Sequence, residues 1–155
     1  MKDASYLIDI ARTKCILVAT AESCTGGMLA SEITEMPGSS DIFDCGFVTY
    51  SNAAKEAMLG VRAATLARFG AVSEEVAREM ATGAQARSRA DMAVSITGIA
   101  GPGASGHKPE GRVCFALAHK ADLLSETVEF GAIGRNHVRK AATGHALSLL
   151  IRALA

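Results

Sequence analysis

The chain has 155 residues, of which 49% are apolar and 21% are charged. These values are typical of one globular domain with a single core, and they exclude a disordered chain. Sixteen basic residues balance sixteen acidic residues, which argues against a protein that binds nucleic acid through a wide basic face. No apolar run approaches the ~18 residues of a membrane span, and the first residues lack the apolar segment of a signal peptide. We therefore expect a cytoplasmic protein without nucleic-acid or membrane partners.

The four cysteines and four histidines form no metal-binding pattern. No C-x-x-C pair or H-E-x-x-H motif is present, so neither a zinc site nor a thioredoxin motif is indicated. Cys15, Cys45 and Cys114 lie in apolar, strand-like runs and are predicted to be buried free thiols. We expect no metal ion and no cofactor, and a reducing compartment suits the free cysteines.

Hydrophobic periodicity and capping signals predict helices and strands that alternate through most of the chain. Such an order indicates an α/β fold with a parallel sheet covered on both faces, and a closing strand pair makes the sheet mixed. The first half is predicted to contain a helix at 3–12, a strand at 15–20, a helix at 28–36, a strand at 45–51 and a short helix capped by Asn52. The second half is predicted to contain a helix capped by Ser73, a strand at 91–97, an antiparallel pair at 112–119 and 124–130 joined by about four residues, and a helix at 136–153.

The segment AESCTGG joins the first predicted strand to the next helix. Backbone N–H groups at a helix start are unpaired and can hold an oxyanion or a phosphate. Ser23, Cys24 and Thr25 lie at this turn as candidate nucleophiles, and Gly26 and Gly27 complete it. The alternative is that Ser23 or Thr25 only caps the helix, because both residue types are favoured at that position.

The segment TYSNAAK follows the second predicted strand, with Tyr50 at the strand end and Lys55 in the first turn of the next helix. The positive end of a helix dipole lowers the pKa of a nearby lysine. A lysine that is neutral for part of the time can act as the general base that a serine nucleophile needs. The alternative is a half-buried strand tyrosine and a surface lysine.

The segment TGIAGPG follows the third predicted strand and opens a glycine-rich loop that contains Thr97, Gly98 and Gly101. Glycines let a backbone approach a ligand closely. In α/β sheets ligands bind beyond the carboxyl ends of the strands, so these three segments predict one shared site. The alternative is an ordinary flexible loop with solvated cations. The side chains that could bind a phosphate there are Lys108, Arg112, Arg135 and Arg139.

Four segments in this order, AESCTGG, GFVTYSNAAK, FGAVSEEVA and SITGIAGPG with KPEGRV, resemble the CinA C-terminal domain family over nearly the whole chain. The resemblance implies a single domain at 1–155 with a three-layer α/β/α sandwich and a mixed, mostly parallel five-stranded sheet. It implies the stand-alone form, without the molybdopterin-binding-like domain that precedes it in many members. It also implies nicotinamide-nucleotide amidohydrolase activity, which converts nicotinamide mononucleotide and water to nicotinate mononucleotide and ammonia in bacterial pyridine-nucleotide recycling.

The family's motif serine falls on Ser23, and its tyrosine and lysine fall on Tyr50 and Lys55. In the mechanism that this implies, Lys55 takes the Ser23 proton directly or through the Tyr50 hydroxyl, and N–H groups of residues 24–27 hold the oxyanion. The glycine-rich loop and Arg135 or Arg139 would hold the ribose phosphate of a mononucleotide. A homodimer is also expected.

The chain departs from the family where members often carry Gly-Asp-Arg, because it reads Ile133-Gly134-Arg135 and lacks the acid. Three other functions remain open from the residues alone. The first is a non-catalytic mononucleotide-binding module in which Ser23 only caps a helix. The second is an amidase or esterase that uses Cys24, and the third is a domain that recruits a partner protein.

Overall fold

The computed structural model describes residues 3–155 and contains a five-stranded sheet with the strand order β2-β1-β3-β4-β5. β1 pairs in parallel with β2 and with β3, whereas β3 with β4 and β4 with β5 are antiparallel. All strands except β4 therefore run in one direction, which confirms the predicted mixed, mostly parallel sheet. The strands are β1 (Val18–Glu22), β2 (Phe43–Val48), β3 (Met92–Gly98), β4 (Arg112–His119) and β5 (Asp122–Glu129).

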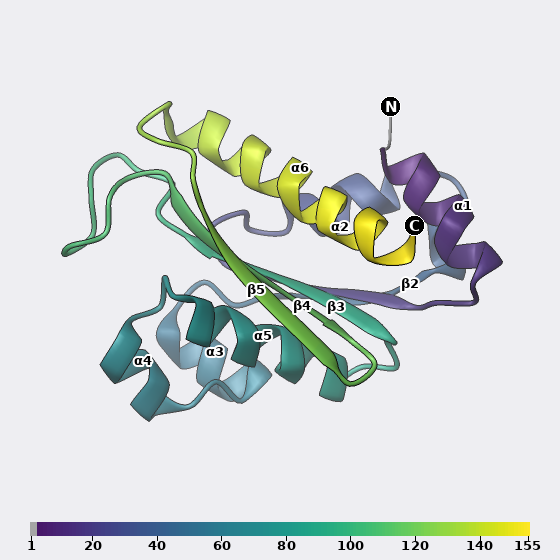
Figure 1. Ribbon diagram of the computed structural model, residues 1–155, viewed down its shortest axis with the longest axis horizontal. Coiled ribbons are helices and arrows are strands. Elements are labelled where there is room, and N and C mark those ends of the chain that lie inside the picture. The colour runs from purple at the N-terminus through teal and green to yellow at the C-terminus, as the bar shows by residue number, and fades with distance from the viewer. Residues whose placement is uncertain (1–2) are drawn as a thin grey trace.

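Helices cover both faces of the sheet and complete the predicted three-layer α/β/α fold (Figure 1). None of the helices within residues 3–155 is long and apolar enough to cross a membrane. One face carries α1 (Ala4–Thr13), α2 (Met28–Thr34) and α6 (Arg135–Leu154), and the other carries α3 (Asn52–Leu59), α4 (Ala63–Phe69) and α5 (Glu74–Ala86).

The central strands lie between two apolar layers. Every residue of β1 is buried, and β3 is buried from Met92 to Thr97, because a parallel strand covered on both faces has no solvated side. Leu29 and Ile33 of α2 pack into the cluster on the α6 face, and Met80 of α5 packs into the cluster on the opposite face. This packing holds the carboxyl ends of β1, β2 and β3 in fixed positions beside one another.

Side-chain caps begin the two helices for which a cap was predicted. Ser73 Oγ accepts a hydrogen bond from the N–H of Val76, as expected for the cap of α5. The predicted cap Asn52 is wrong by one residue, because Ser51 Oγ accepts the N–H of Ala54 at 3.0 Å and Asn52 is already helical. The displaced cap keeps Lys55 in the first turns of α3.

Two of the three cysteine predictions are wrong. Cys15 is exposed and has a φ of +55° in the turn after α1, so β1 starts only at Val18. Cys45 is half-buried, because β2 is an edge strand of the sheet. Cys114 in β4 is buried as predicted. The apolar run that begins at Cys15 therefore includes a connecting turn, which hydrophobicity alone does not distinguish from a strand.

The sequence prediction missed α4 and misplaced two connections. Arg62 precedes α4 but makes no side-chain capping bond, so the start signal on which the prediction depends is absent. β2 ends at Val48 rather than at residue 51. β5 starts at Asp122, which pairs with His119, so two residues join the hairpin rather than about four.

Candidate active site

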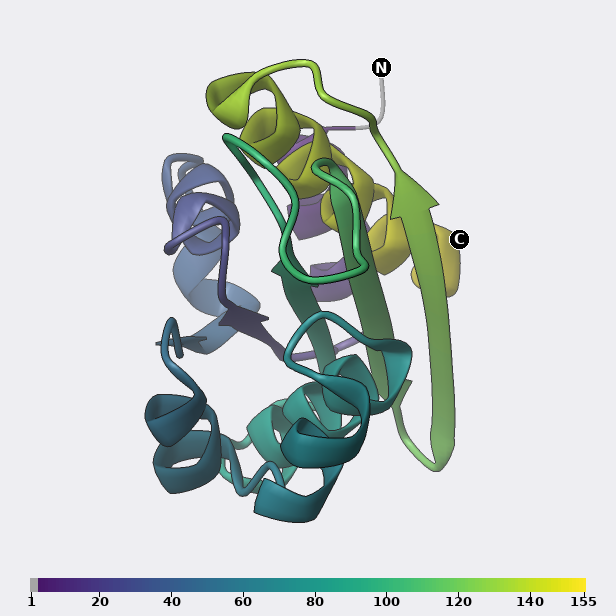
Figure 2. The same cartoon turned by 90° about the vertical axis from the view of Figure 1, so that its left-hand side faces the viewer.

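The three predicted segments meet at one end of the sheet, because they follow the adjacent parallel strands β1, β2 and β3. The long loop after β3 lies on the same side of the molecule as the start of α6 (Figure 2). Between these segments is a cavity of about 330 Å³. The predicted site residues that line it are Ser23, Cys24, Tyr50, Lys55, Thr97, Gly98, Gly101 and Arg135.

Ser23 and Lys55 are in direct contact in this cavity. Ser23 is the first residue after β1, and its N–H bonds to the carbonyl of Ile96 at 2.9 Å, which ties it to β3. Lys55 extends from α3 with only 1% of its surface exposed. Its Nζ lies 3.0 Å from Ser23 Oγ. A predicted nucleophile and its predicted base are therefore within hydrogen-bond distance.

Two backbone carbonyls orient the amine of Lys55. Its Nζ donates to the carbonyl oxygens of Thr49 at 2.9 Å and Tyr50 at 3.1 Å. Burial lowers the pKa of Lys55 from its ordinary value of 10.5, because desolvation disfavours the charged form. A charged amine donates to Ser23 Oγ and to both carbonyls, whereas a neutral amine has two N–H groups for the carbonyls and a lone pair that can accept from the Ser23 hydroxyl. The direction of the predicted pKa shift is confirmed, but burial rather than the helix dipole is its main cause.

The Tyr50 phenol does not lie between Ser23 and Lys55. Tyr50 is 60% exposed, and its hydroxyl accepts a hydrogen bond from Arg135 Nη2 at 2.9 Å. Arg135 Nη1 donates to the carbonyl of Gly101 at 2.6 Å. Tyr50 contacts the lysine through its backbone carbonyl, and its ring belongs to the rim of the cavity. The rim thus joins the segment after β2, the glycine-rich loop and α6.

Cys24 lines the same cavity but its thiol is held in the protonated form. Only 5% of Cys24 is exposed, and burial raises its pKa to about 11, more than the charges of Arg139 and Lys55 lower it. A thiolate is the reactive form of cysteine. At neutral pH the Cys24 side chain is therefore a weaker candidate nucleophile than Ser23 beside Lys55.

The start of α2 is already occupied by a carboxylate that the sequence prediction missed. Glu22, the last residue of β1, accepts hydrogen bonds from the N–H groups of Leu29 at 2.9 Å and Ala30 at 3.0 Å. The N–H of Gly26 bonds to the carbonyl of Ser23 at 3.1 Å. Thr25, Gly26 and Gly27, which were predicted to hold the oxyanion, do not line the cavity. An acid directly before the nucleophile, at a strand-to-helix turn, is the sequence signal for Glu22.

Among the cations predicted to bind phosphate, Arg135 is the one that lines the cavity. Lys108 donates instead to the carbonyls of Phe69 and Val72 and thereby fastens the glycine-rich loop to the segment between α4 and α5. Arg112 pairs with Glu129 at 2.6 Å. Arg139 donates to the carbonyls of Cys24 and Thr25 and lies behind the turn rather than in the cavity.

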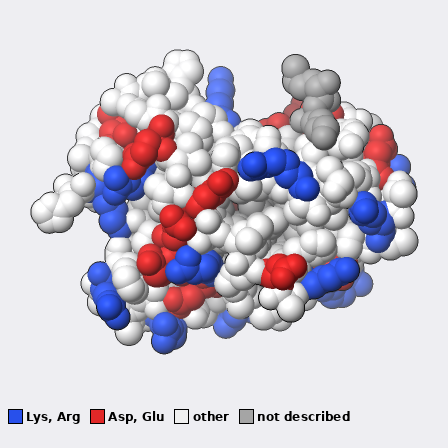
Figure 3. Space-filling view, in the orientation of Figure 1, with Lys and Arg blue, Asp and Glu red and all other residues white. Residues whose placement is uncertain are grey.

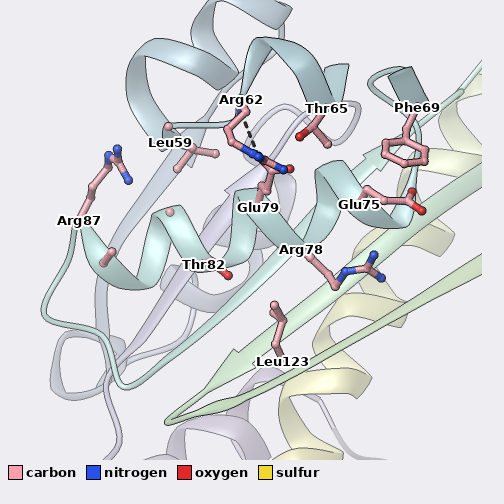
Figure 4. Close-up of a pocket in the computed structure, with 13 residues that line it drawn as sticks. Leu59, Arg62, Thr65, Phe69, Glu75, Arg78, Glu79, Thr82, Arg87 and Leu123 are labelled. Atoms are coloured by element: carbon pink, nitrogen blue, oxygen red, sulfur yellow. Dashed lines mark hydrogen bonds and ion pairs between the residues drawn. The ribbon is translucent and has the colours of Figure 1, made fainter. Parts of the chain in front are cut away.

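A second cavity, of about 510 Å³, lies among α3, α4, α5 and the start of β5 (Figure 4). It contains an ion pair between Arg62 and Glu79 at 3.5 Å, and Thr65 and Thr82 lie along it. None of its lining residues is a predicted site residue.

Acidic and basic side chains are mixed on the face in Figure 3. Residues 3–155 contain no group of three or more side chains suited to a metal ion.

Comparisons with known proteins show similarity both to proteins of about the length of this chain and to proteins about three times as long. A nicotinamide-nucleotide amidohydrolase, PncC, from Escherichia coli strain K12 is 54% identical over 134 residues, which are 86% of this chain and 81% of that protein. A putative competence-damage inducible protein from Symbiobacterium thermophilum is 50% identical over 147 residues, 88% of this chain and 34% of that protein. The chain spans about a third of the length of these longer relatives.

Solved structures and a family model agree with the sequence resemblance. The crystal structure of the competence/damage inducible protein CihA from Agrobacterium tumefaciens superposes with a TM-score of 0.94 at 48% identity, covering 97% of this chain and 92% of that one. A CinA superfamily protein from Escherichia coli gives a TM-score of 0.94 at 37% identity, covering 97% and 87%. The model of the CinA C-terminal domain matches residues 2–154. The chain therefore belongs to the CinA C-terminal domain family.

Proposed function

We propose that this chain is an amidohydrolase that converts nicotinamide mononucleotide and water to nicotinate mononucleotide and ammonia. The observation that carries the proposal is the 3.0 Å contact between Lys55 Nζ and Ser23 Oγ, with two carbonyls orienting the amine. The substrate is taken from the name of the 54% identical PncC relative. The reaction belongs to pyridine-nucleotide recycling in the cytoplasm.

The first half of the reaction forms an acyl-enzyme. Neutral Lys55 accepts the proton of Ser23 Oγ, and the oxygen attacks the carbon of the carboxamide. The oxyanion that forms is held by the backbone at Cys24, which lines the cavity next to Ser23. Protonated Lys55 then gives its proton to the amide nitrogen, so that the C–N bond breaks and ammonia leaves.

The second half returns the enzyme to its starting state. Lys55, neutral again, takes a proton from a water molecule that attacks the acyl carbon. The tetrahedral intermediate collapses, the bond to Ser23 Oγ breaks, and Lys55 returns the proton to Ser23. The products are one carboxylic acid and one ammonia for each water consumed, and the acid then gives its proton to the ammonia to leave carboxylate and ammonium. The proposed steps thus need no group beyond the serine, the lysine and the backbone N–H groups.

The rim of the cavity contains the side chain that would bind the phosphate group of the nucleotide substrate. Arg135 is held by the Tyr50 hydroxyl and the Gly101 carbonyl, and a guanidinium has five N–H groups, which leaves further donors for an anion. Gly101 has a φ of +92°, a conformation that favours glycine, and a Cβ there would lie 1.8 Å from Glu110 Oε1, so the packing of the loop itself requires glycine at this position. Binding at this distance from the amide would orient the reacting group.

The test is ammonia release from nicotinamide mononucleotide by wild type, Ser23→Ala and Lys55→Ala. Ser31→Ala and Lys140→Ala are matched controls, since both residues are exposed and lie outside the cavity. We expect each active-site variant to lose ~10³-fold or more in kcat and the controls to keep it. Near-wild-type release by Ser23→Ala or Lys55→Ala would reject the mechanism. Binding of the nucleotide by wild type without release would favour the non-catalytic module instead.

Cys24→Ala separates the serine mechanism from a cysteine mechanism at the same turn. We expect this variant to keep kcat within about threefold, because the raised pKa keeps the thiol protonated and unreactive at neutral pH. Ammonia release by Cys24→Ala and its alkylation by iodoacetamide at neutral pH provide the measurement. Loss of ammonia release from a folded Cys24→Ala variant, together with rapid alkylation of wild-type Cys24, would assign the nucleophile to the thiol.

A further inference from the structure

The turn that carries Ser23 is held from two sides by side chains of opposite charge. On one side, Glu22 has only 1% of its surface exposed, and its carboxylate accepts the Thr25 hydroxyl at 2.6 Å and the N–H groups of Leu29 and Ala30. A buried carboxylate with three donors makes strong, charge-assisted hydrogen bonds. Glu22 therefore fixes the turn to the start of α2.

On the other side, Arg139 of α6 binds the carbonyl oxygens of the same turn. Its Nε donates to the Cys24 carbonyl at 3.0 Å, and its Nη2 donates to the Thr25 carbonyl at 3.3 Å. A Cβ added to Gly26, whose φ is +60°, would lie 3.3 Å from Nη2. The guanidinium thus packs closely against the turn.

The backbone of Glu22 connects this turn to the base. The N–H of Thr49 donates to the Glu22 carbonyl at 2.9 Å. The Thr49 carbonyl in turn accepts from Lys55 Nζ at 2.9 Å. Glu22 is therefore bonded through its side chain to the turn that follows Ser23 and through its backbone to a residue that orients Lys55. Neither Glu22 nor Arg139 lines the cavity, so neither is placed to contact the substrate.

We propose that Glu22 and Arg139 are positioning residues that hold Ser23 Oγ in line with the Lys55 amine. The proposal rests on the proposed function for its kinetic readout. Because a displacement of about 1 Å at a reacting group can cost ~10²-fold in rate, loosening the turn acts on the chemical step. Substrate binding, which uses other residues, stays nearly unchanged.

The test compares Glu22→Gln and Arg139→Gln with wild type. Gln keeps the shape of Glu22 but replaces one acceptor oxygen by an NH₂ group, which cannot accept from a backbone N–H. We expect kcat for ammonia release to fall about tenfold or more while KM stays within about threefold. Arg139→Lys keeps a cation near the carbonyls and should regain part of kcat. Glu35→Gln, at the exposed end of α2, and Lys140→Gln, at an exposed position of α6, are matched controls and should behave as wild type.

A second readout does not depend on the substrate. The rate at which a fluorophosphonate labels Ser23 should fall in Glu22→Gln and Arg139→Gln in parallel with kcat, at unchanged far-UV circular dichroism. If wild type releases no ammonia, the proposed function fails and the labelling rates still test positioning. Wild-type kcat and labelling in folded Glu22→Gln and Arg139→Gln would overturn the proposal. If Glu22→Gln does not fold, the Arg139 variants decide alone.

Discussion

At Lys55, the proposed base, the pKa is lowered by burial rather than by a neighbouring charge. Within the described part of the chain no carboxylate pairs with its Nζ, and its polar contacts are two carbonyls and the Ser23 hydroxyl. Burial removes water from the ammonium form of Lys55, and desolvation therefore lowers the pKa of this amine from its ordinary value. The proposed catalytic contact therefore depends on the burial of the Lys55 amine and on the two carbonyls that orient it.

The pH dependence of activity follows from the lowered pKa of Lys55. In the proposed mechanism Lys55 must be neutral, so kcat/KM should rise with pH through the pKa of Lys55, which lies below 10.5, and then level off. The free energy of unfolding should also rise with pH over this range. At pH values between the pKa of Lys55 in the folded state and 10.5, the unfolded chain binds more protons than the folded chain, so raising the pH favours the folded state. A pH profile of kcat/KM whose lower limb lies at or above 10.5 would contradict a buried lysine base.

Tyr50→Phe distinguishes direct proton transfer from a relay through the phenol. The variant removes the acceptor of Arg135 Nη2 but keeps the Tyr50 backbone carbonyl that contacts Lys55. We expect kcat to stay within about threefold and KM to rise several-fold, because Arg135 loses one anchor at the rim. Steady-state kinetics on ammonia release measure both constants. A loss in kcat comparable with that of Lys55→Ala would instead show that the hydroxyl carries the proton.

Among the helices, the contact of α3 with α5 positions Lys55. Gly83 of α5 lies directly against the end of α3, where a Cβ would be 1.9 Å from the Leu59 carbonyl oxygen. A backbone atom cannot move aside as a flexible side chain can. The absence of a side chain at Gly83 thus sets the distance between the helix that carries Lys55 and the helix beneath it.

Gly83→Ala should therefore destabilise the protein, with Gly144→Ala of α6 as its matched control. Both glycines are helical, but within residues 3–155 no atom outside the neighbouring residues and the backbone of α6 itself lies within 4 Å of a Cβ at Gly144. We expect Gly83→Ala to lower the free energy of unfolding by about 1–3 kcal/mol and Gly144→Ala to raise it by about 0.5–1 kcal/mol. Urea denaturation measures both changes. Equal stabilisation by the two substitutions would mean that α3 can move away from α5 without cost.

The convergence of Ser23 and Lys55 was predictable from sequence because it needs only strand order and direction. Parallel strands bring their carboxyl ends to one edge, so residues after β1 and β2 had to lie close together. The partners of Glu22 and Arg139 were not predictable, since they depend on how α2 and α6 pack on the sheet. The direction of the Tyr50 ring is likewise decided by Arg135, which lies 85 positions away in the chain.

At the scale of the whole molecule, the sheet is the support and the loops at one end are the site. The segments after β1, β2 and β3 supply Ser23, the carbonyls that orient Lys55, and the glycine-rich wall of the cavity. α6 crosses behind them and contributes Arg135 to the rim and Arg139 to the turn. The predicted homodimer stays a prediction, as does the position of the phosphate at Arg135.

Stopping the reaction by acid in the first turnover, and then mapping the modified peptide by mass spectrometry, shows which side chain carries the acyl group. We expect an acyl group derived from nicotinate mononucleotide on Ser23, present in wild type and absent from Ser23→Ala. An acyl group on Cys24 instead, or continued ammonia release by Ser23→Ala, would contradict the proposed serine mechanism.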